Sequence, residues 1–168
     1  MSRILGIDPG SRITGFGIID AEGNRVRHVV SGAIRTPDAI FPQRLRTIFE
    51  QLSAILDEYQ PELVAIEQVF VNRNVSSALK LGQARGAAIC AAAVRDLPIA
   101  EYAPTQIKRT VVGSGGASKE QVQYMVRALL NVAQALQADA ADALAVALCH
   151  NQHLPMERHL QQRQEKTT

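Results

Sequence analysis

The segment LGIDPGSRITGFGIID, residues 5–20, decides the fold of this chain of 168 residues. It contains two runs rich in apolar and β-branched residues, joined by the tight turn Pro9-Gly10-Ser11. A second turn signal, Glu22-Gly23-Asn24, leads into a third run of the same kind, VRHVVSGAI at residues 26–34. Because connections this short join antiparallel neighbours, the first 35 residues predict a meander of three strands.

Strand and helix patterns alternate in the rest of the chain. LVAIE (63–67) is typical of a short strand covered on both faces, and IAEY (99–102) gives a fifth strand. Antiparallel strands followed by this alternation predict an α/β fold with a mixed five-stranded sheet flanked by helices. Five helices are expected. The first begins at Pro42 and ends before Pro61, and the second begins at Ser76 or Ser77 and ends near Asp96. The third begins at Pro104, the fourth begins at Ser118 with a Gln121 capping box, and the fifth runs from about Asp139 to His150.

Length and composition indicate a single domain over residues 1–154. Residues 155–168 are polar, rich in Gln and Arg and without an apolar period, so we predict a disordered tail there. No apolar run approaches the roughly 20 residues needed to span a bilayer, and the N-terminus has no signal-peptide pattern. We therefore expect a cytoplasmic protein without membrane contact. Cys90 and Cys149 lie in Ala-rich helical patterns and are predicted to be buried free thiols.

Four acidic residues come from three separate segments of the chain. Asp8 and Glu67 each end a predicted strand, whereas Asp139 and Asp142 stand three apart on one face of a predicted helix. Taken singly, each has an ordinary explanation: a turn residue, an ion-pair partner, an N-cap and a first-turn acid. Together they would repel one another, so their convergence predicts a divalent cation site. Oxygen ligands without nearby His or Cys favour Mg²⁺ or Mn²⁺, and metal-assisted phosphodiester cleavage is the leading hypothesis.

The charge distribution fits a nucleic-acid substrate. The formal net charge is +2, but residues 68–127 contain eight basic and three acidic side chains, a local charge of +5 that leaves −3 for the remainder. A basic middle segment can contact phosphates while the acidic remainder holds the metal. The alternative is a set of ordinary solvated helix faces.

Three segments of the chain resemble the RuvC Holliday junction resolvases: IDPGSRITGFGII (7–19), AIEQVFVNRNVSSALKLGQARG (65–86) and QADAADALAVAL (137–148). The likeness extends from about Arg3 to His150. It implies a ribonuclease H-like fold and a homodimer with one active site per subunit. It also implies Mg²⁺-dependent paired nicking of four-way DNA junctions in recombination and repair, with the branch-migration proteins RuvA and RuvB as partners.

The resemblance also implies roles for individual residues. It makes the four acids the metal ligands and catalytic groups. Because a phosphodiester repels hydroxide, we expect two Mg²⁺ ions, or Mn²⁺, about 3.5–4 Å apart, bridged by Asp8 and held on either side by Glu67 and by Asp139 or Asp142. It makes Lys108 a catalytic cation at the scissile phosphate, and for both Lys108 and Lys119 the alternative is a solvated helix lysine. Phe70 is expected to stack on an unpaired base, although a core position is the alternative. The remaining predicted DNA contacts are Arg73, Asn74, Arg85 and Lys119, and the Ala- and Gly-rich helix after residue 75 is expected to contribute to the dimer interface.

Two other classes of protein are compatible with parts of this pattern. Actin-like and sugar-kinase-like ATPases also begin with a strand, an Asp and a Gly-containing turn, but they need a second related domain for which this chain has no room. A non-catalytic junction-binding protein would use the same acids only structurally. Intrinsic ATP hydrolysis would favour the first class, and binding without cleavage would favour the second.

Overall fold

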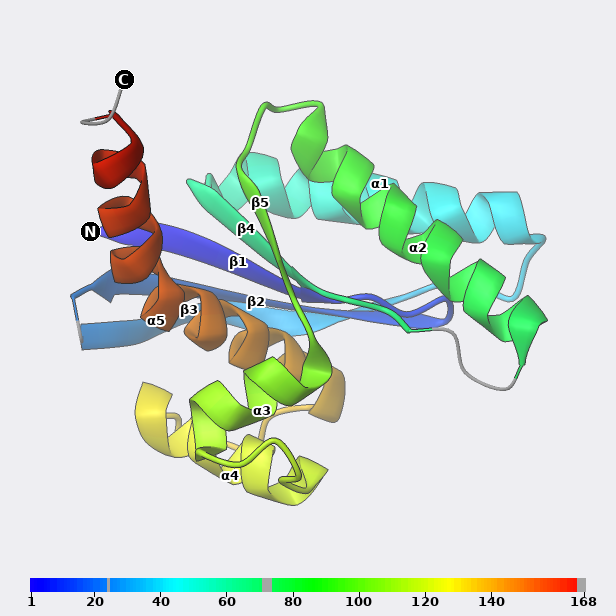
Figure 1. Cartoon of the computed structure of the whole chain (residues 1–168). Coiled ribbons are helices and arrows are strands. Elements are labelled where there is room, and N and C mark those ends of the chain that lie inside the picture. The colour runs from blue at the N-terminus through cyan, green and yellow to red at the C-terminus, as the bar shows by residue number, and fades with distance from the viewer. Residues whose placement is uncertain (24, 71–73, 166–168) are drawn as a thin grey trace.

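The computed structural model describes residues 1–23, 25–70 and 74–165, and for residues 155–165 it describes the backbone alone. Its centre is one mixed sheet of five strands in the order β3-β2-β1-β4-β5 (Figure 1). The first three strands pair antiparallel, while β1, β4 and β5 pair parallel, which confirms the predicted sheet. The strands are β1 (Ser2–Asp8), β2 (Ile13–Glu22), β3 (Arg25–Arg35), β4 (Leu63–Glu67) and β5 (Ile99–Tyr102).

Helices cover both faces of the sheet (Figure 1). Alternate residues of the strands point to opposite faces. Leu5 and Ile18 therefore pack in the cluster that holds α1 and α2, and Ile4 and Ile19 pack in the cluster that holds α3, α4 and α5. The sheet thus separates two apolar cores. The helices are α1 (Phe41–Tyr59), α2 (Val75–Ala93), α3 (Pro104–Val112), α4 (Lys119–Leu130) and α5 (Ala138–Glu165).

Helix α5 lies directly against β1 and β2 because glycines leave room for its backbone. A Cβ atom at Gly6 would overlap the carbonyl oxygen of Ala143, and one at Gly15 would overlap the carbonyl oxygen of Asp139. Gly15 pairs with Asp8 in the β1–β2 ladder. The close approach therefore brings the first turn of α5 to the end of β1, where Asp8 stands.

Several details differ from the sequence-based expectations. Helix α2 is capped by Asn74, whose side chain accepts from the backbone N–H of Ser77 at 3.1 Å, and the two serines lie inside the helix. The capping box of Ser118 and Gln121 is confirmed. Both cysteines are free; Cys149 is buried, but Cys90 is exposed, because its position on α2 points away from the sheet.

Helix α5 continues to Glu165, although we expected a disordered tail from residue 155. The segment contains three Gln, two Glu and two Arg, residues that favour helix without needing an apolar face. The prediction underestimated this local preference, whereas the domain boundary at residue 154 stays a prediction. In the described ranges, no helix is both long and apolar enough to cross a membrane.

Candidate active site

The structure brings the four predicted acids to one edge of the sheet. Strands β1 and β4 are parallel neighbours with Ile7 opposite Ile66, so the residues that follow, Asp8 and Glu67, emerge at the same carboxyl edge. This edge is where open α/β sheets usually bind ligands. The first two turns of α5 add Asp139 and Asp142, and all four acids are partly buried. Residues separated by more than 130 positions thus share one charged edge.

Burial and nearby negative charges raise the pKa values of three of these acids, Asp8, Glu67 and Asp142. Burial is the largest cause for Asp8, and together with the charges of Glu67, Asp142 and Asp139 and a hydrogen bond with Glu67 it raises the pKa of Asp8 to about 8. Burial also raises the pKa of Glu67, although the hydrogen bond from Asp8 and two lysines act in the opposite direction. The pKa of Asp142 is raised as well, chiefly by burial. Asp8 and Glu67 are hydrogen-bonded to each other and titrate as a coupled pair, so near neutral pH the pair retains a proton.

Two lysines from α3 and α4 face this acidic edge. The Nζ atom of Lys119 lies 3.7 Å from Oδ2 of Asp142, and both Lys119 and Lys108 lower the pKa of Glu67. The lysines and acids border a small cavity of about 70 Å³, so cations and carboxylates share one recess. Its lining residues are Glu67, Pro104, Ile107, Lys108, Lys119, Val122, Asp142 and Ala145.

The donor set fits a hard divalent cation, although the side chains are not in a ligating arrangement. Within the described part of the chain, no three His, Cys, Asp or Glu side chains stand ready to hold a metal ion. Asp8 is hydrogen-bonded to Glu67, and Asp142 lies near Lys119. Burial and the charges of three acids nevertheless raise the pKa of Asp8, and a bound cation would stabilise its ionised form. Metal binding would therefore require Asp8 to release its proton.

The other predicted site residues surround this edge. Phe70 follows β4 by three residues and is 63% exposed, which excludes the alternative of a core position. Asn74 caps α2, and Lys119 is exposed. Arg73 lies outside the described residues. Arg85 is directed inward: its Nε donates to the backbone oxygen of Glu67 at 3.2 Å, and its side chain is only 19% exposed.

The glycines that make this site possible were not predicted as site residues. Gly6 and Gly15 lie inside strand patterns, and a glycine at such a position is a known signal of close backbone approach. It also missed Glu101 on β5, which pairs with Arg85. A single acid in a four-residue strand carries no local signal of that contact, which depends on how α2 lies on the sheet.

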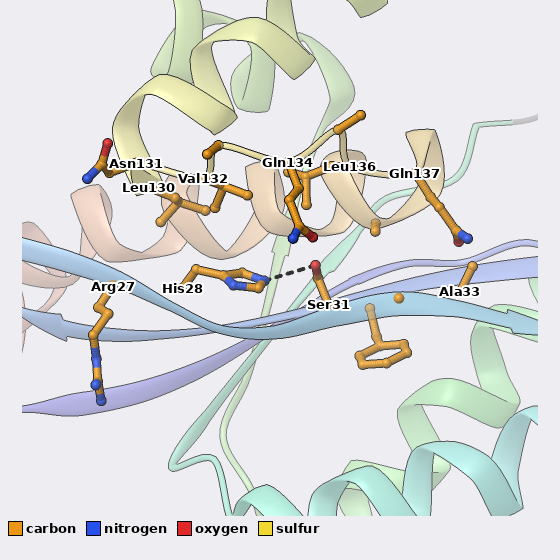
Figure 2. A pocket seen from close by; sticks show the side chains of 15 residues that line it. Arg27, His28, Ser31, Ala33, Leu130, Asn131, Val132, Gln134, Leu136 and Gln137 are labelled. Carbon is orange, nitrogen blue, oxygen red and sulfur yellow. Dashed lines mark hydrogen bonds between the residues drawn. The ribbon is translucent and has the colours of Figure 1, made fainter.

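A second and larger hollow contains none of the predicted site residues. It has a volume of about 910 Å³ and lies between β3 and the segment that follows α4 (Figure 2). His28 and Ser31 of β3 are hydrogen-bonded there at 3.0 Å, and Gln134 points toward them from the facing segment (Figure 2). Its lining includes amides and hydroxyls but no carboxylate, so it differs chemically from the acidic edge.

The sheet order, the helices on both faces and the acidic edge define a ribonuclease H-like protein. The yeast mitochondrial Holliday junction resolvase Ydc2 shares this fold, with a TM-score of 0.69 at 13% identity over 99% of this chain and 85% of that one. A structure of T. thermophilus RuvC in complex with Holliday junction substrate is more similar. Its TM-score is 0.87 at 34% identity, covering 94% of this chain and 97% of that chain.

The chain belongs to the RuvC family. The family model for crossover junction endodeoxyribonuclease RuvC matches residues 4–150. The crossover junction endodeoxyribonuclease RuvC of Hydrogenovibrio crunogenus is 57% identical over 156 residues, which are 93% of this chain and 91% of that protein. The RuvC of Alkalilimnicola ehrlichii is 55% identical over 95% of this chain and 97% of its own length. The family resemblance found in the sequence is thus confirmed.

Proposed function

We propose that this chain is a structure-specific endonuclease that resolves four-way DNA junctions by paired nicking of opposing strands, in homologous recombination and DNA repair. The observation that carries the proposal is the acidic edge, where burial and three neighbouring carboxylates raise the pKa of Asp8 to about 8. Its relatives bear the name crossover junction endodeoxyribonuclease, and a similar structure is a RuvC in complex with Holliday junction substrate.

Asp8, Glu67, Asp139 and Asp142 would hold Mg²⁺, with two ions per active site and Mn²⁺ as a substitute. The metal supplies an activated water and neutralises negative charge on the phosphodiester. Asp8 would hold the cation in its ionised form, so the proton that it shares with Glu67 would have to leave for metal to bind.

Lys108 and Lys119 border the same recess as Glu67 and Asp142, on the side formed by α3 and α4. From there their ammonium groups can contact the scissile phosphate and stabilise the charge that develops on it. Phe70, exposed beyond the end of β4, is suited to stack on a base that has left its pair at the junction. Arg73 and Asn74 follow it in the chain as proposed backbone contacts.

Paired nicking needs two active sites, which a homodimer supplies. Helix α2 has the surface for such an interface: Val75, Leu79 and nearby Val94 are exposed, and nothing lies within 4 Å of a Cβ built at Gly82 or Gly86. We propose that a second copy packs on this helix. From the family resemblance we also propose that RuvA and RuvB are its branch-migration partners and that it is cytoplasmic.

Nicking of a synthetic, branch-migratable four-way junction tests the proposal, with wild type compared with folded Asp8→Asn. Wild type with Mg²⁺ should make symmetric nicks. The variant should still bind the junction, but its cleavage rate should be lower by a factor of about 10³ or more. Wild type that binds without nicking, on several junction sequences and with Mn²⁺ as well, would leave a junction-binding module instead.

A further inference from the structure

The guanidinium of Arg85 points into the protein and contacts groups beside the acidic edge. The Nε–H donates to the backbone oxygen of Glu67 at 3.2 Å, and Nη2 lies 2.7 Å from Oε2 of Glu101. The Nη2 atom is itself buried from solvent, and its contact with Glu101 is an ion pair without hydrogen-bond geometry. Two arms of one planar group are therefore directed at two neighbouring strands, β4 and β5.

The strand register explains why these contacts act at one point of the sheet. Glu101 pairs with Ile66 in the parallel β4–β5 ladder, one residue before Glu67. Arg85 consequently ties α2 to the ends of both strands at the place where the chain leaves β4. The side chain of Glu67 departs from the same residue whose carbonyl Arg85 holds.

We propose that Arg85 is a positioning residue, held in place by Glu101, that fixes the end of β4 and so the direction of the Glu67 carboxylate toward Asp8. The inference rests on the proposed function, since it assigns Arg85 a task in the same active site. It replaces the hypothesis that Arg85 guides a DNA phosphate. A guanidinium that already contacts a carbonyl and a carboxylate, and is 19% exposed, has little of its fork left for DNA.

The two hypotheses differ most clearly at Glu101. This side chain is 45% exposed and negatively charged, so its neutralisation should leave DNA binding unchanged or strengthen it if Arg85 is a phosphate contact. If Arg85 is a positioning residue, the same change removes its support and slows cleavage. Arg85→Lys is also informative, because an ammonium is a point charge and cannot reach both the Glu67 carbonyl and the Glu101 carboxylate as the planar guanidinium does.

The experiment compares wild type with full-length Arg85→Gln, Arg85→Lys and Glu101→Gln. Single-turnover cleavage of the synthetic junction is measured against Mg²⁺ concentration, and junction Kd is measured against salt. For Arg85→Gln we expect cleavage slower by about 10–100-fold and a higher Mg²⁺ midpoint, with Kd and its salt slope unchanged. Glu101→Gln should change in the same direction by a smaller factor, and Arg85→Lys should lie between Arg85→Gln and wild type.

Weaker junction binding by Arg85→Gln, with a salt slope smaller by about one, would overturn the proposal in favour of a phosphate contact. Full cleavage by Glu101→Gln at every Mg²⁺ concentration would overturn it as well. If Arg85→Gln does not fold, Glu101→Gln decides alone, since its partly exposed side chain can be changed with little effect on the core. Failure of the proposed function is distinguishable, because wild type itself would then make no nicks.

Discussion

Two aspartates at opposite ends of the β1–β2 ladder have opposite electrostatic surroundings. Asp20 is buried on β2, opposite Arg3, and accepts from Nε of Arg3 at 2.7 Å and from Nη2 of Arg27 at 2.8 Å. These guanidiniums lower the pKa of Asp20 below its usual value. Asp8, at the other end, faces three acids, and its pKa is raised to about 8. The pKa of an aspartate is thus lowered at one end of this strand pair and raised at the other.

Burial alone does not explain the difference, because it raises the pKa at both positions. What differs is the compensating charge. The negative charge of Asp20 is compensated within the protein by ion pairs with Arg3 and Arg27. Asp8 has only a proton, which a metal ion can displace. A carboxylate with fixed cationic partners stabilises the fold, whereas one among other carboxylates is suited to an external cation.

The largest effect on stability is expected from Asp20→Asn. The change leaves the guanidiniums of Arg3 and Arg27 facing a neutral amide. Removing one partner of a buried ion pair commonly costs about 3 kcal/mol or more. Here we expect a loss of about 2 kcal/mol, because both arginines reach solvent. The melting temperature should fall by about 4–8 °C. Thermal unfolding at pH 7 measures this, and the cleavage rate of the folded variant at 25 °C should equal that of wild type.

The pH dependence of Asp20→Asn provides the check. Because folding lowers the pKa of Asp20, its stabilisation is complete above the unfolded-state value of 3.8 and is lost as pH falls through the lower folded-state value. The difference between wild type and variant should therefore shrink in acid. A variant that is as stable as wild type at pH 7 would show that the arginines stabilise the fold without Asp20.

A smaller effect of opposite sign is expected from Asp8→Asn in the absence of divalent metal. Because folding raises the pKa of Asp8, the stability linked to this group is largest below 3.8 and is lost as pH rises through about 8. The variant lacks this loss. At pH 9 in EDTA it should therefore melt higher than wild type by about 2–4 °C, equivalent to about 1 kcal/mol.

Mg²⁺ should reverse that order. The cation supplies the charge that the proton supplied, so at pH 9 it should raise the melting temperature of wild type more than that of Asp8→Asn. Equal stabilisation of both proteins would place the binding site elsewhere. A constant difference between pH 5 and pH 9 in EDTA would contradict the assignment of the titrating group.

The sequence predicts the acidic edge better than the arginine cluster for a physical reason. Asp8 and Glu67 end strongly patterned strands, and Asp139 and Asp142 stand at helical spacing, so local patterns place each acid at the end of its element. The parallel β1–β4 pairing and the close packing of α5 then bring them together. Asp20 meets its arginines only through the strand register, which pairs it with residues on β1 and β3. Register is set by the whole sheet and is not written in any one segment.

The helix ends show the same limit on a smaller scale. Ser118 and Gln121 form the expected capping box because both halves of the signal lie within one turn. At α2, by contrast, three polar residues stood near the expected start, and only the backbone turn decides that Asn74 is the cap. Arg85 is the most distant case, since its contacts join α2, β4 and β5, and only the packed structure brings them together.

The smallest effect is expected from Lys119→Gln, which removes a cation from the acidic edge. Lys119 is 74% exposed and lies 3.7 Å from Asp142, so its loss should change stability by less than about 1 kcal/mol. It lowers the pKa of Glu67 and Asp142, and without it both values should rise. Calorimetric titration with Mg²⁺ across pH 6–9 should therefore show a binding midpoint displaced to higher pH.

Arg25→Gln is the matched control, because it removes the same charge from an exposed residue at the Asp20 end of the sheet, where β3 begins. If the two variants shift the Mg²⁺ midpoint equally, the effect belongs to the net charge of the protein. A shift confined to Lys119→Gln would show that a lysine close to the carboxylates partly compensates their negative charge, as Arg3 and Arg27 compensate the charge of Asp20. The contrast between the two aspartates would then be a matter of local partners, which a single lysine can adjust.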